Sequence, residues 1–294
     1  MDTIGFIGLG NMGASLADRL IGAGRRLMVF DLRADRAAEL GSRGAVVADC
    51  ARQVGENSRV VFACLPSREA SLSVASEVAA TRTLEVYVEM STIGAETMSA
   101  IARMLDPDIA TIDAPVSGGP RGAKVGTLSI MVAGSAEVIA RIRPLLDLMG
   151  GKVFVVGHRP GLAQICKLVN NAISFTALTV SCEAIVLGVK AGLDAATLID
   201  VINASTGRNA ATIDRFPACV LPRTFNGGGL LGGVIKDIEL YLAEADRLKL
   251  SAPSVRNTLE VWSKAVERLD PSQDFTNIVR YFEEHAGIEV KGRA

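Results

Sequence analysis

The sequence predicts an α/β domain with a doubly wound, mostly parallel sheet, followed by an all-α domain that a long helix joins to it. Two observations support this fold class. Up to about residue 160, short apolar runs alternate with helix-forming stretches, which is typical of a parallel sheet covered by helices on both faces. After that point the strand-like runs stop and helical periodicity takes over. We therefore expect two domains, residues 1–160 and residues 161–294.

The strands of the first domain are predicted from short apolar runs. The helix-forming segments ASLADRLIGAG and RADRAAELGSRG follow the first two of these runs, as a strand–helix–strand unit requires. A parallel sheet buried on both faces has strands of this continuous apolar kind. The predicted strands cover residues 3–8, 26–31, 59–64, 86–90, 111–116, 128–134 and 152–157.

The second domain is predicted to be helical throughout. A long run covers residues 162–191, and the string AGLD then supplies a C-cap glycine and Asp194 as the next N-cap. The apolar stretch within this run is long enough for a membrane span, but Glu183 lies in its middle, so a buried core helix is the preferred interpretation. Further helices are predicted at residues 194–203, 234–249, 254–269 and 273–286.

Composition narrows the classes of partner and chemistry. The chain of 294 residues has a formal net charge of -1, and its only tight basic cluster is Arg25–Arg26, so we expect neither a nucleic acid nor a membrane as partner. Five cysteines without a C-x-x-C pair argue against a disulfide framework and predict a reducing, cytoplasmic location. With only two histidines, no metal site is expected. We therefore predict that the partner is a small molecule.

The string IGFIGLGNMG near the start of the chain predicts a Rossmann-like dinucleotide site. Its glycines follow an apolar strand, precede a helix and have the spacing G-x-G-x-x-G. The first glycine permits a tight turn, the second lets a pyrophosphate approach the backbone, and the third lets the helix pack on the strand. The helix N-terminus then offers its N–H groups to the phosphates. The predicted cofactor-binding loop is Gly8, Leu9, Gly10, Asn11, Met12 and Gly13.

Asp31 ends the second predicted strand, 18 residues after Gly13. A carboxylate at this place accepts hydrogen bonds from the ribose hydroxyls of NAD and repels the additional phosphate of NADP. Arg33, which follows Leu32, softens this preference, so NAD is favoured and NADP is the alternative. The other interpretation of Asp31 is a turn cap. Loops after the next two strands, with Leu65, Pro66 and Thr92, lie at the carboxyl ends of the strands, where ligands bind in such sheets.

Three further strings carry a family resemblance: DAPVSGG at residues 113–119, GLAQICKLVNN at 161–171 and IKDIEL at 235–240. Together with GFIGLGNMG, in this order and over nearly the whole chain, they resemble the β-hydroxyacid dehydrogenase family, which contains 3-hydroxyisobutyrate dehydrogenase and tartronate semialdehyde reductase. The resemblance implies an enzyme that interconverts a small β-hydroxyacid and its semialdehyde or keto acid with NAD or NADP. It also implies a homodimer or homotetramer formed through the helical half.

The resemblance assigns roles to polar residues whose spacing is already notable. Lys167, Asn170 and Asn171 project from one face of an otherwise apolar helix. By resemblance, Lys167 is the general acid/base, and Asn171, with Asn170 beside it, holds the substrate. The alternative is a solvated helix end. A lysine in this role needs a pKa lowered toward the working pH by burial or a neighbouring cation.

Other roles follow from the same resemblance. Ser117, Gly118 and Gly119 grip the substrate carboxylate, although a plain strand-to-helix turn is the alternative. Lys236 and Asp237 lie near substrate and nicotinamide, with a solvated helix charge as the other interpretation. Relatives place the equivalents of Leu65, Pro66, Thr92, Phe225 and Lys236 against the cofactor. At Gly229 the sequence departs from the family pattern, because many relatives have an aromatic residue there. We therefore expect a looser wall of the substrate site or a larger substrate.

Two rival functions share these motifs. The first is an NADPH-dependent semialdehyde or imine reductase on the same scaffold. The second is a non-catalytic dinucleotide-binding module. Lys167 argues against both, since imine reductases usually lack this lysine and a binding module does not need it.

Overall fold

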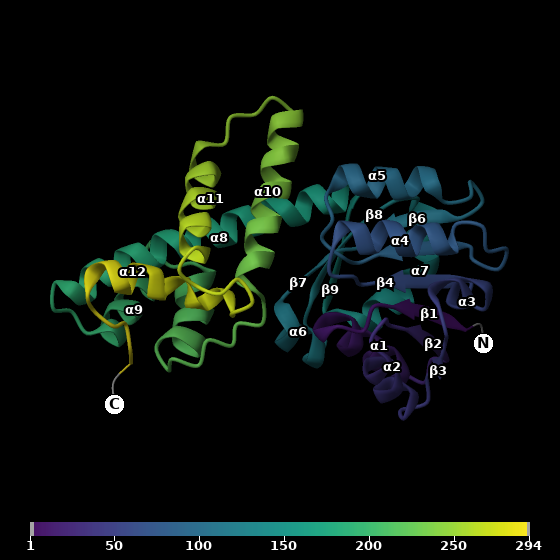
Figure 1. Cartoon of the computed structure of the whole chain (residues 1–294), viewed down its shortest axis with the longest axis horizontal. Helices are drawn as coiled ribbons and strands as arrows, with labels where there is room; N and C mark the ends of the chain where they lie inside the picture. Colours follow the sequence, from purple (N-terminus) through teal and green to yellow (C-terminus); the bar gives the residue numbers. More distant parts are fainter. Residues whose placement is uncertain (1–2, 293–294) are drawn as a thin grey trace. The chain divides into compact units, whose positions relative to one another are not determined.

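The computed structural model describes residues 3–292 and consists of two compact units (Figure 1). The first unit ends at Lys167 and the second begins at Leu168. Both residues belong to α8, an uninterrupted helix from Leu162 to Lys190, so the division falls inside this helix. The predicted domain boundary, at residue 160, lies just before α8 begins.

The first unit is built on a sheet in which nine strands are described. The strands β3, β2, β1, β4, β5 and β6 lie in this order and are all parallel. At the far side, β8 is antiparallel to both β6 and β7 and parallel to β9. The predicted mostly parallel sheet is confirmed. The strands are β1 (Ile4–Ile7), β2 (Leu27–Phe30), β3 (Val46–Val47), β4 (Val60–Ala63), β5 (Val86–Glu89), β6 (Ala110–Asp113), β7 (Val116–Ser117), β8 (Ser129–Ala133) and β9 (Lys152–Gly157).

Helices cover both faces of this sheet, because successive side chains of a strand point to opposite faces. On β1, Phe6 belongs to an apolar cluster with α1, α2 and α7, whereas Ile7 belongs to a second cluster with α3, α4 and α5. Both side chains are essentially inaccessible to solvent. The helices are α1 (Asn11–Gly22), α2 (Ala34–Gly41), α3 (Ala51–Glu56), α4 (Arg68–Val78), α5 (Ala95–Met104), α6 (Gly119–Val125) and α7 (Ala136–Met149).

Two strand predictions need correction. The run predicted as one strand at residues 111–116 forms two strands, β6 and β7, because Pro115 lies between them and has no N–H to donate. The two-residue strand β3 was not predicted. Its valines, Val46 and Val47, are both exposed, and the apolar run around them, residues 45–48, is short.

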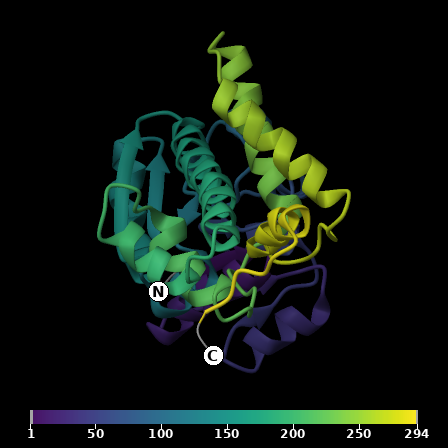
Figure 2. The same ribbon diagram turned by 90° about the vertical axis from the view of Figure 1, so that its left-hand side faces the viewer.

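The second unit is helical, as predicted, and packs around a second apolar core. Trp262 is fully buried there, and its indole N–H donates to Thr179 Oγ1 at 2.8 Å. α10 and α11 pack side by side in both views (Figure 1 and Figure 2). Beyond the remaining turns of α8, the elements are α9 (Ala195–Asn203), the π-helix η1 (Ala211–Val220), α10 (Leu231–Arg247), α11 (Pro253–Val266), the 3₁₀-helix η2 (Phe275–Asn277) and α12 (Ile278–Ala286).

Several helix boundaries differ from the prediction. Asp194 caps α9 through Thr197 N–H, as expected, but α10 begins at Leu231, three residues before the predicted start. The predicted helix at residues 273–286 is divided into η2 and α12, and the predicted helix at 254–269 ends at Val266. The π-helix η1 was not predicted, because Pro217 within it argues against a regular helix.

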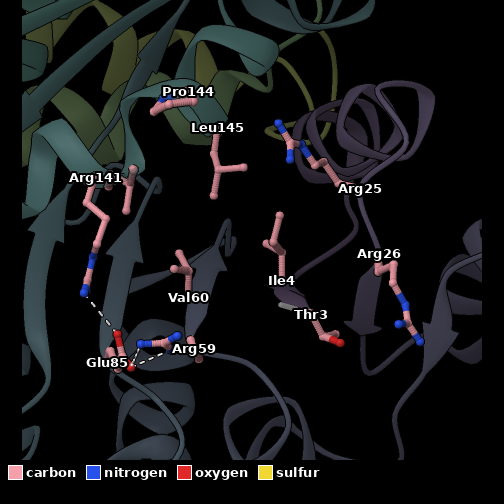
Figure 3. A pocket seen from close by; sticks show the side chains of 11 residues that line it. Thr3, Ile4, Arg25, Arg26, Arg59, Val60, Glu85, Arg141, Pro144 and Leu145 are labelled. Carbon is pink, nitrogen blue, oxygen red and sulfur yellow. Dashed lines mark hydrogen bonds and ion pairs between the residues drawn. The ribbon is translucent and has the colours of Figure 1, made fainter. Parts of the chain in front are cut away.

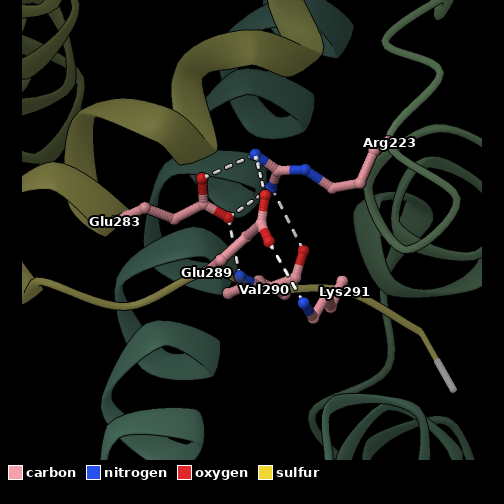
Figure 4. Close-up of polar contacts among 5 residues, drawn as sticks. All are labelled: Arg223, Glu283, Glu289, Val290 and Lys291. Atoms are coloured by element: carbon pink, nitrogen blue, oxygen red, sulfur yellow. Dashed lines mark hydrogen bonds and ion pairs between the residues drawn. The ribbon is translucent and has the colours of Figure 1, made fainter. Parts of the chain in front are cut away.

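A buried ion pair fastens the last described segment to the second unit (Figure 4). The carboxylate of Glu283, which is 6% exposed, pairs with the guanidinium of Arg223. The same carboxylate accepts the N–H of Val290 at 2.7 Å, and Arg223 donates to the Val290 carbonyl at 3.2 Å. Glu289 adds a third charge at 3.3 Å from Arg223. This network satisfies both backbone groups of Val290 in the segment after α12.

Candidate active site

The glycine loop between β1 and α1 has the shape that a pyrophosphate requires. A Cβ on Gly8, whose φ is +88°, would lie 2.3 Å from the Cys64 carbonyl oxygen, and one on Gly13 would lie 2.0 Å from the Gly8 carbonyl oxygen. Both glycines therefore permit close backbone packing. A Cβ on Gly10 would meet nothing within 4 Å, and no side chain caps α1 at this end. The N–H groups at the start of α1 thus face open space, which fits the pyrophosphate of a dinucleotide.

Asp31 lies against this loop. Its Oδ2 accepts the N–H of Leu9 at 2.6 Å, and its Oδ1 accepts the N–H of Arg33 at 2.8 Å. Asp31 therefore caps the turn after β2, which is one of the two interpretations of this residue. It also holds its carboxylate beside the glycine loop, as the predicted ribose contact requires. Arg33 pairs with Asp35 at 2.7 Å, which partly balances its charge, and Leu32 is almost fully exposed.

The loops after β4 and β5 meet at the same edge of the sheet. The N–H of Leu65 donates to Ser91 Oγ at 2.7 Å, which joins the two loops directly. Pro66 is exposed and Thr92 is half-buried. Because β4 lies next to β1 and β5 next to β4, the structure gathers these predicted cofactor residues with the glycine loop at the carboxyl ends of the strands.

Gln164 connects the beginning of α8 to this edge. Its side chain is fully buried, and its Oε1 accepts the N–H groups of Ile93 and Gly94 at 3.0 and 3.3 Å. Its Nε2 donates to the Ser91 carbonyl at 3.0 Å. One amide thus satisfies three backbone groups of the loop after β5. Gln164 was not predicted as a functional residue, because a glutamine on a helix is equally typical of a solvated position.

Two buried carboxyls support the same edge, at the ends of β5 and β6. Asp113 Oδ2 accepts the N–H of Gln164 at 3.0 Å; burial raises the pKa of Asp113 to about 6, against the opposing effect of backbone N–H groups in the first turn of α8. Glu89 accepts the N–H of Ser91 at 2.9 Å and the hydroxyl of Tyr87 at 3.1 Å, and burial raises its pKa too. An acid within an apolar strand was the indication of these two residues in the sequence.

Lys167 lies one turn beyond Gln164 on α8. Only 8% of its surface is exposed, which is low for a lysine and agrees with the expectation of burial. Since the Gln164 amide fixes the start of α8 to the loop after β5, Lys167 projects from a helix whose position at the cofactor edge is set by buried hydrogen bonds.

The SGG turn joins β7 to α6. Gly118 has φ of +127° and Gly119 of +65°, and both angles favour glycine. A Cβ on Gly118 would also lie 2.9 Å from the Leu128 side chain. Ser117 pairs with Ser129 in the ladder of β7 and β8. The turn exposes the backbone of Gly118, which is compatible with the predicted contact to a carboxylate.

Four of the predicted substrate residues form one polar cluster in the second unit. Asn171, which is 7% exposed, donates from Nδ2 to Asp237 Oδ2 at 2.7 Å. Lys236 Nζ lies 3.2 Å from Asp237 Oδ1, and Asn170, which is exposed, donates to Asn171 Oδ1 at 3.2 Å. Asp237 therefore fixes the orientation of the Asn171 amide, so that the amide oxygen of Asn171 faces Asn170.

The glycine-rich segment before α10 is held more firmly than the sequence indicates. Gly228 donates its N–H to Asp274 Oδ2 at 2.7 Å, and a Cβ on Gly229 would lie 3.2 Å from the ring of Phe275. The Phe275 ring thus packs on the backbone of Gly229. Phe225 has the guanidinium of Arg280 4.4 Å from its ring centre.

Comparisons with known proteins show the family to which this chain belongs. The family model for the NAD-binding domain of 6-phosphogluconate dehydrogenase matches residues 3–157, and the model for the NAD-binding domain of NADP-dependent 3-hydroxyisobutyrate dehydrogenase matches residues 161–282. A 3-hydroxyisobutyrate dehydrogenase of Pseudomonas aeruginosa is 36% identical, over 96% of this chain and 99% of its own. The chain belongs to the β-hydroxyacid dehydrogenase family.

Other members of the family are similar over their whole length. An NAD-dependent L-serine dehydrogenase of Pseudomonas aeruginosa is 32% identical, over 98% of this chain and 100% of its own. The solved structure of Mycobacterium tuberculosis 3-hydroxyisobutyrate dehydrogenase with L-serine superimposes with a TM-score of 0.87 at 30% identity, covering 96% of this chain and 99% of that one. The predicted enzyme class is confirmed: this β-hydroxyacid dehydrogenase is an oxidoreductase that uses a nicotinamide dinucleotide.

Proposed function

We propose that this dehydrogenase interconverts a small β-hydroxyacid, of the size of 3-hydroxyisobutyrate, and its semialdehyde or keto acid, with Lys167 as general acid/base. The observation that carries the proposal is the buried position of Lys167, one turn beyond the Gln164 amide that ties α8 to the cofactor edge of the sheet. A buried lysine is rare without a structural or chemical reason.

The proposed chemistry divides between cofactor and protein. The bound nicotinamide supplies the acceptor or donor of the hydride. Lys167 takes the proton from the substrate hydroxyl during oxidation and returns it to the oxygen during reduction. Its positive charge in the protonated form stabilises negative charge that develops on that oxygen.

Substrate recognition is proposed for two groups of residues. The backbone of Gly118 and Gly119, with Ser117, binds the carboxylate, and Asn171 binds the hydroxyacid through an amide whose orientation Asp237 fixes. The named substrates of the similar proteins, 3-hydroxyisobutyrate and L-serine, are both small carboxylates with a hydroxyl on the β-carbon. This common feature supports a β-hydroxyacid for the present chain.

NAD is the proposed cofactor. The Asp31 carboxylate beside the glycine loop has further acceptor capacity for ribose hydroxyls and would repel the 2′-phosphate of NADP. The ion pair of Arg33 with Asp35 supports this choice, because it reduces the positive charge available to that phosphate.

The experiment that tests the function is a panel of β-hydroxyacids measured by absorbance at 340 nm with both cofactors. We expect turnover of at least one small β-hydroxyacid and a kcat/KM at least about tenfold higher with NAD than with NADP, since a lost bidentate contact and charge repulsion together exceed about 1.4 kcal/mol. Turnover only with NADP would contradict the role of Asp31, and no turnover of any hydroxyacid would contradict the proposed reaction.

We also propose that the enzyme forms a homodimer or homotetramer through α8. By length and composition, α8 is also the one helix among the described residues that is apolar enough to cross a membrane. Ile173, Val180 and Leu187, at intervals of seven residues, are 67%, 59% and 73% exposed, while the charged Glu183 is exposed between them. A second copy would cover the apolar side chains of this stripe. Light scattering in buffer without detergent tests this, and a monomer would contradict it.

A further inference from the structure

A cavity of about 310 Å³ opens at the amino ends of the parallel strands in the first unit (Figure 3). Ile4 at the start of β1 and Val60 at the start of β4 form its floor, and residues of α7 form its opposite wall. The glycine loop follows the other end of β1. The cavity therefore lies at the amino ends of the strands, whereas the proposed dinucleotide site lies at their carboxyl ends. A ligand in the cavity would not displace the cofactor.

Positive charge predominates in this cavity. Four arginines and one carboxylate line it. The carboxylate, Glu85, is shared: Arg141 Nη1 lies 3.1 Å from its Oε2, and Arg59 pairs with its Oε1. These three groups lie together at one side of the cavity in Figure 3. Arg25 and Arg26 supply the remaining charges from the segment before β2.

Arg25 differs from the other arginines because it is half-buried without a charged partner in the described part of the chain. Its Nε is buried, and within residues 3–292 no acceptor reaches it. In Figure 3 the Arg25 guanidinium points across the cavity toward Leu145, whereas Arg26 points away from the other labelled side chains. The Arg25 guanidinium therefore brings a positive charge without a carboxylate partner to the cavity, where the anionic group of a ligand would be favoured.

The surface between the two charged sides is apolar. Ile4, Val60 and Leu145 lie between Arg25 and the Glu85 ion pairs in Figure 3. An inorganic anion would contact only the arginines, whereas an anion with an aliphatic body would also cover these side chains. Removal of apolar area from water adds affinity in proportion to the area.

We propose that this cavity binds a small organic anion that carries a carboxylate or phosphate group on a short aliphatic body. The anionic group pairs with Arg25, whose planar guanidinium suits either group. The aliphatic body rests on Ile4, Val60 and Leu145. The site is independent of the proposed hydroxyacid reaction, because none of its residues belongs to the glycine loop, the SGG turn or α8.

Titration calorimetry of the NAD-saturated full chain tests the proposal, with n-butyl phosphate and butyrate as separate probes and inorganic phosphate as the probe without an aliphatic body. We expect at least one organic probe to bind in the millimolar range or tighter, and at least about tenfold more tightly than inorganic phosphate. Binding of n-butyl phosphate alone identifies a phosphate ester, and binding of butyrate alone identifies a carboxylate.

Arg25→Gln and the matched control Arg26→Gln separate this cavity from the substrate site, which also accepts carboxylates. We expect Arg25→Gln to weaken the binding of the organic probe about tenfold or more, Arg25→Lys to weaken it less, and Arg26→Gln to stay within about twofold of the parent. The kcat/KM for the hydroxyacid stays within about twofold in all three variants. Unchanged probe affinity in both Arg25 variants, or no binding by the parent, would overturn the proposal.

Discussion

The two units provide their functional groups in different ways. In the first unit, the glycine loop and the SGG turn present backbone groups, and their shape depends on glycines that tolerate no added atom, such as Gly13. In the second unit the functional groups are side chains that hydrogen-bond to one another, as Asn171 does with Asp237. We therefore expect substitutions of closely packed glycines such as Gly13 in the first unit to act on the fold and on binding together, whereas substitutions in the polar cluster of the second unit act on binding alone.

The largest expected effect on stability is in the glycine loop. Gly13→Ala places a methyl group 2.0 Å from the Gly8 carbonyl oxygen, so we expect a loss of about 3 kcal/mol in the free energy of unfolding, measured in urea. Gly10→Ala is the matched control, because its methyl group meets no protein atom within 4 Å. We expect Gly10→Ala to leave stability within about 0.5 kcal/mol and to weaken NAD about tenfold. Equal stabilities of the two variants would contradict the difference between these glycines.

A second expected effect concerns the buried carboxyl of Asp113. Its folded-state pKa of about 6 is raised above that of an exposed aspartate, so the folded protein binds this proton more tightly than the unfolded chain does. The stabilising contribution is therefore full below about pH 4 and is lost as the pH rises through 6. Between pH 4 and pH 7 it amounts to about 2 kcal/mol.

Asp113→Asn removes this contribution and keeps an oxygen that accepts the Gln164 N–H. We expect the difference in unfolding free energy between parent and variant to change by about 2 kcal/mol from pH 4 to pH 7, with the parent losing stability relative to the variant. Urea titrations at the two pH values measure it. A difference that does not depend on pH would show that Asp113 is not the group that titrates.

The smallest effect is expected in the second unit. Asn171→Ala should raise the KM for the hydroxyacid about tenfold, and Asp237→Asn should raise it less, because the amide that replaces the carboxylate still offers one oxygen to Asn171 Nδ2. Unfolding free energies should change by less than about 1 kcal/mol. Glu183→Gln, exposed on the same helix, is the control. A large loss of stability in Asn171→Ala would remove the distinction between the units.

The sequence predicted those parts of the site that depend on local chemistry. A strand, a helix and the glycine spacing between them are local, so the loop from Gly8 to Gly13 and the acid at Asp31 were found at their observed places. The spacing of Lys167 and Asn171 on α8 is local too. The family motifs then located Asp237, which is distant in sequence.

Interactions between distant segments escaped prediction. Gln164 bonds to the loop after β5, about seventy residues away, and no pattern around it distinguishes this role from a solvated helix residue. β3 was missed because its two valines pair at a sheet edge without burial. The start of α10 was misplaced because Gly232 and Gly233 favour a loop, while the Gly232 N–H is satisfied by the Pro271 carbonyl at 3.0 Å.

The most direct test of the proposed chemistry is the steady-state rate of Lys167→Ala, together with the Kd for NADH of the same variant. We predict that kcat falls about a thousandfold, since loss of a general acid/base costs roughly 10²- to 10⁴-fold, while the Kd for NADH stays within about twofold. Lys190→Ala, at the exposed end of the same helix, should match the parent. A Lys167→Ala enzyme with kcat within about tenfold of the parent would contradict the account.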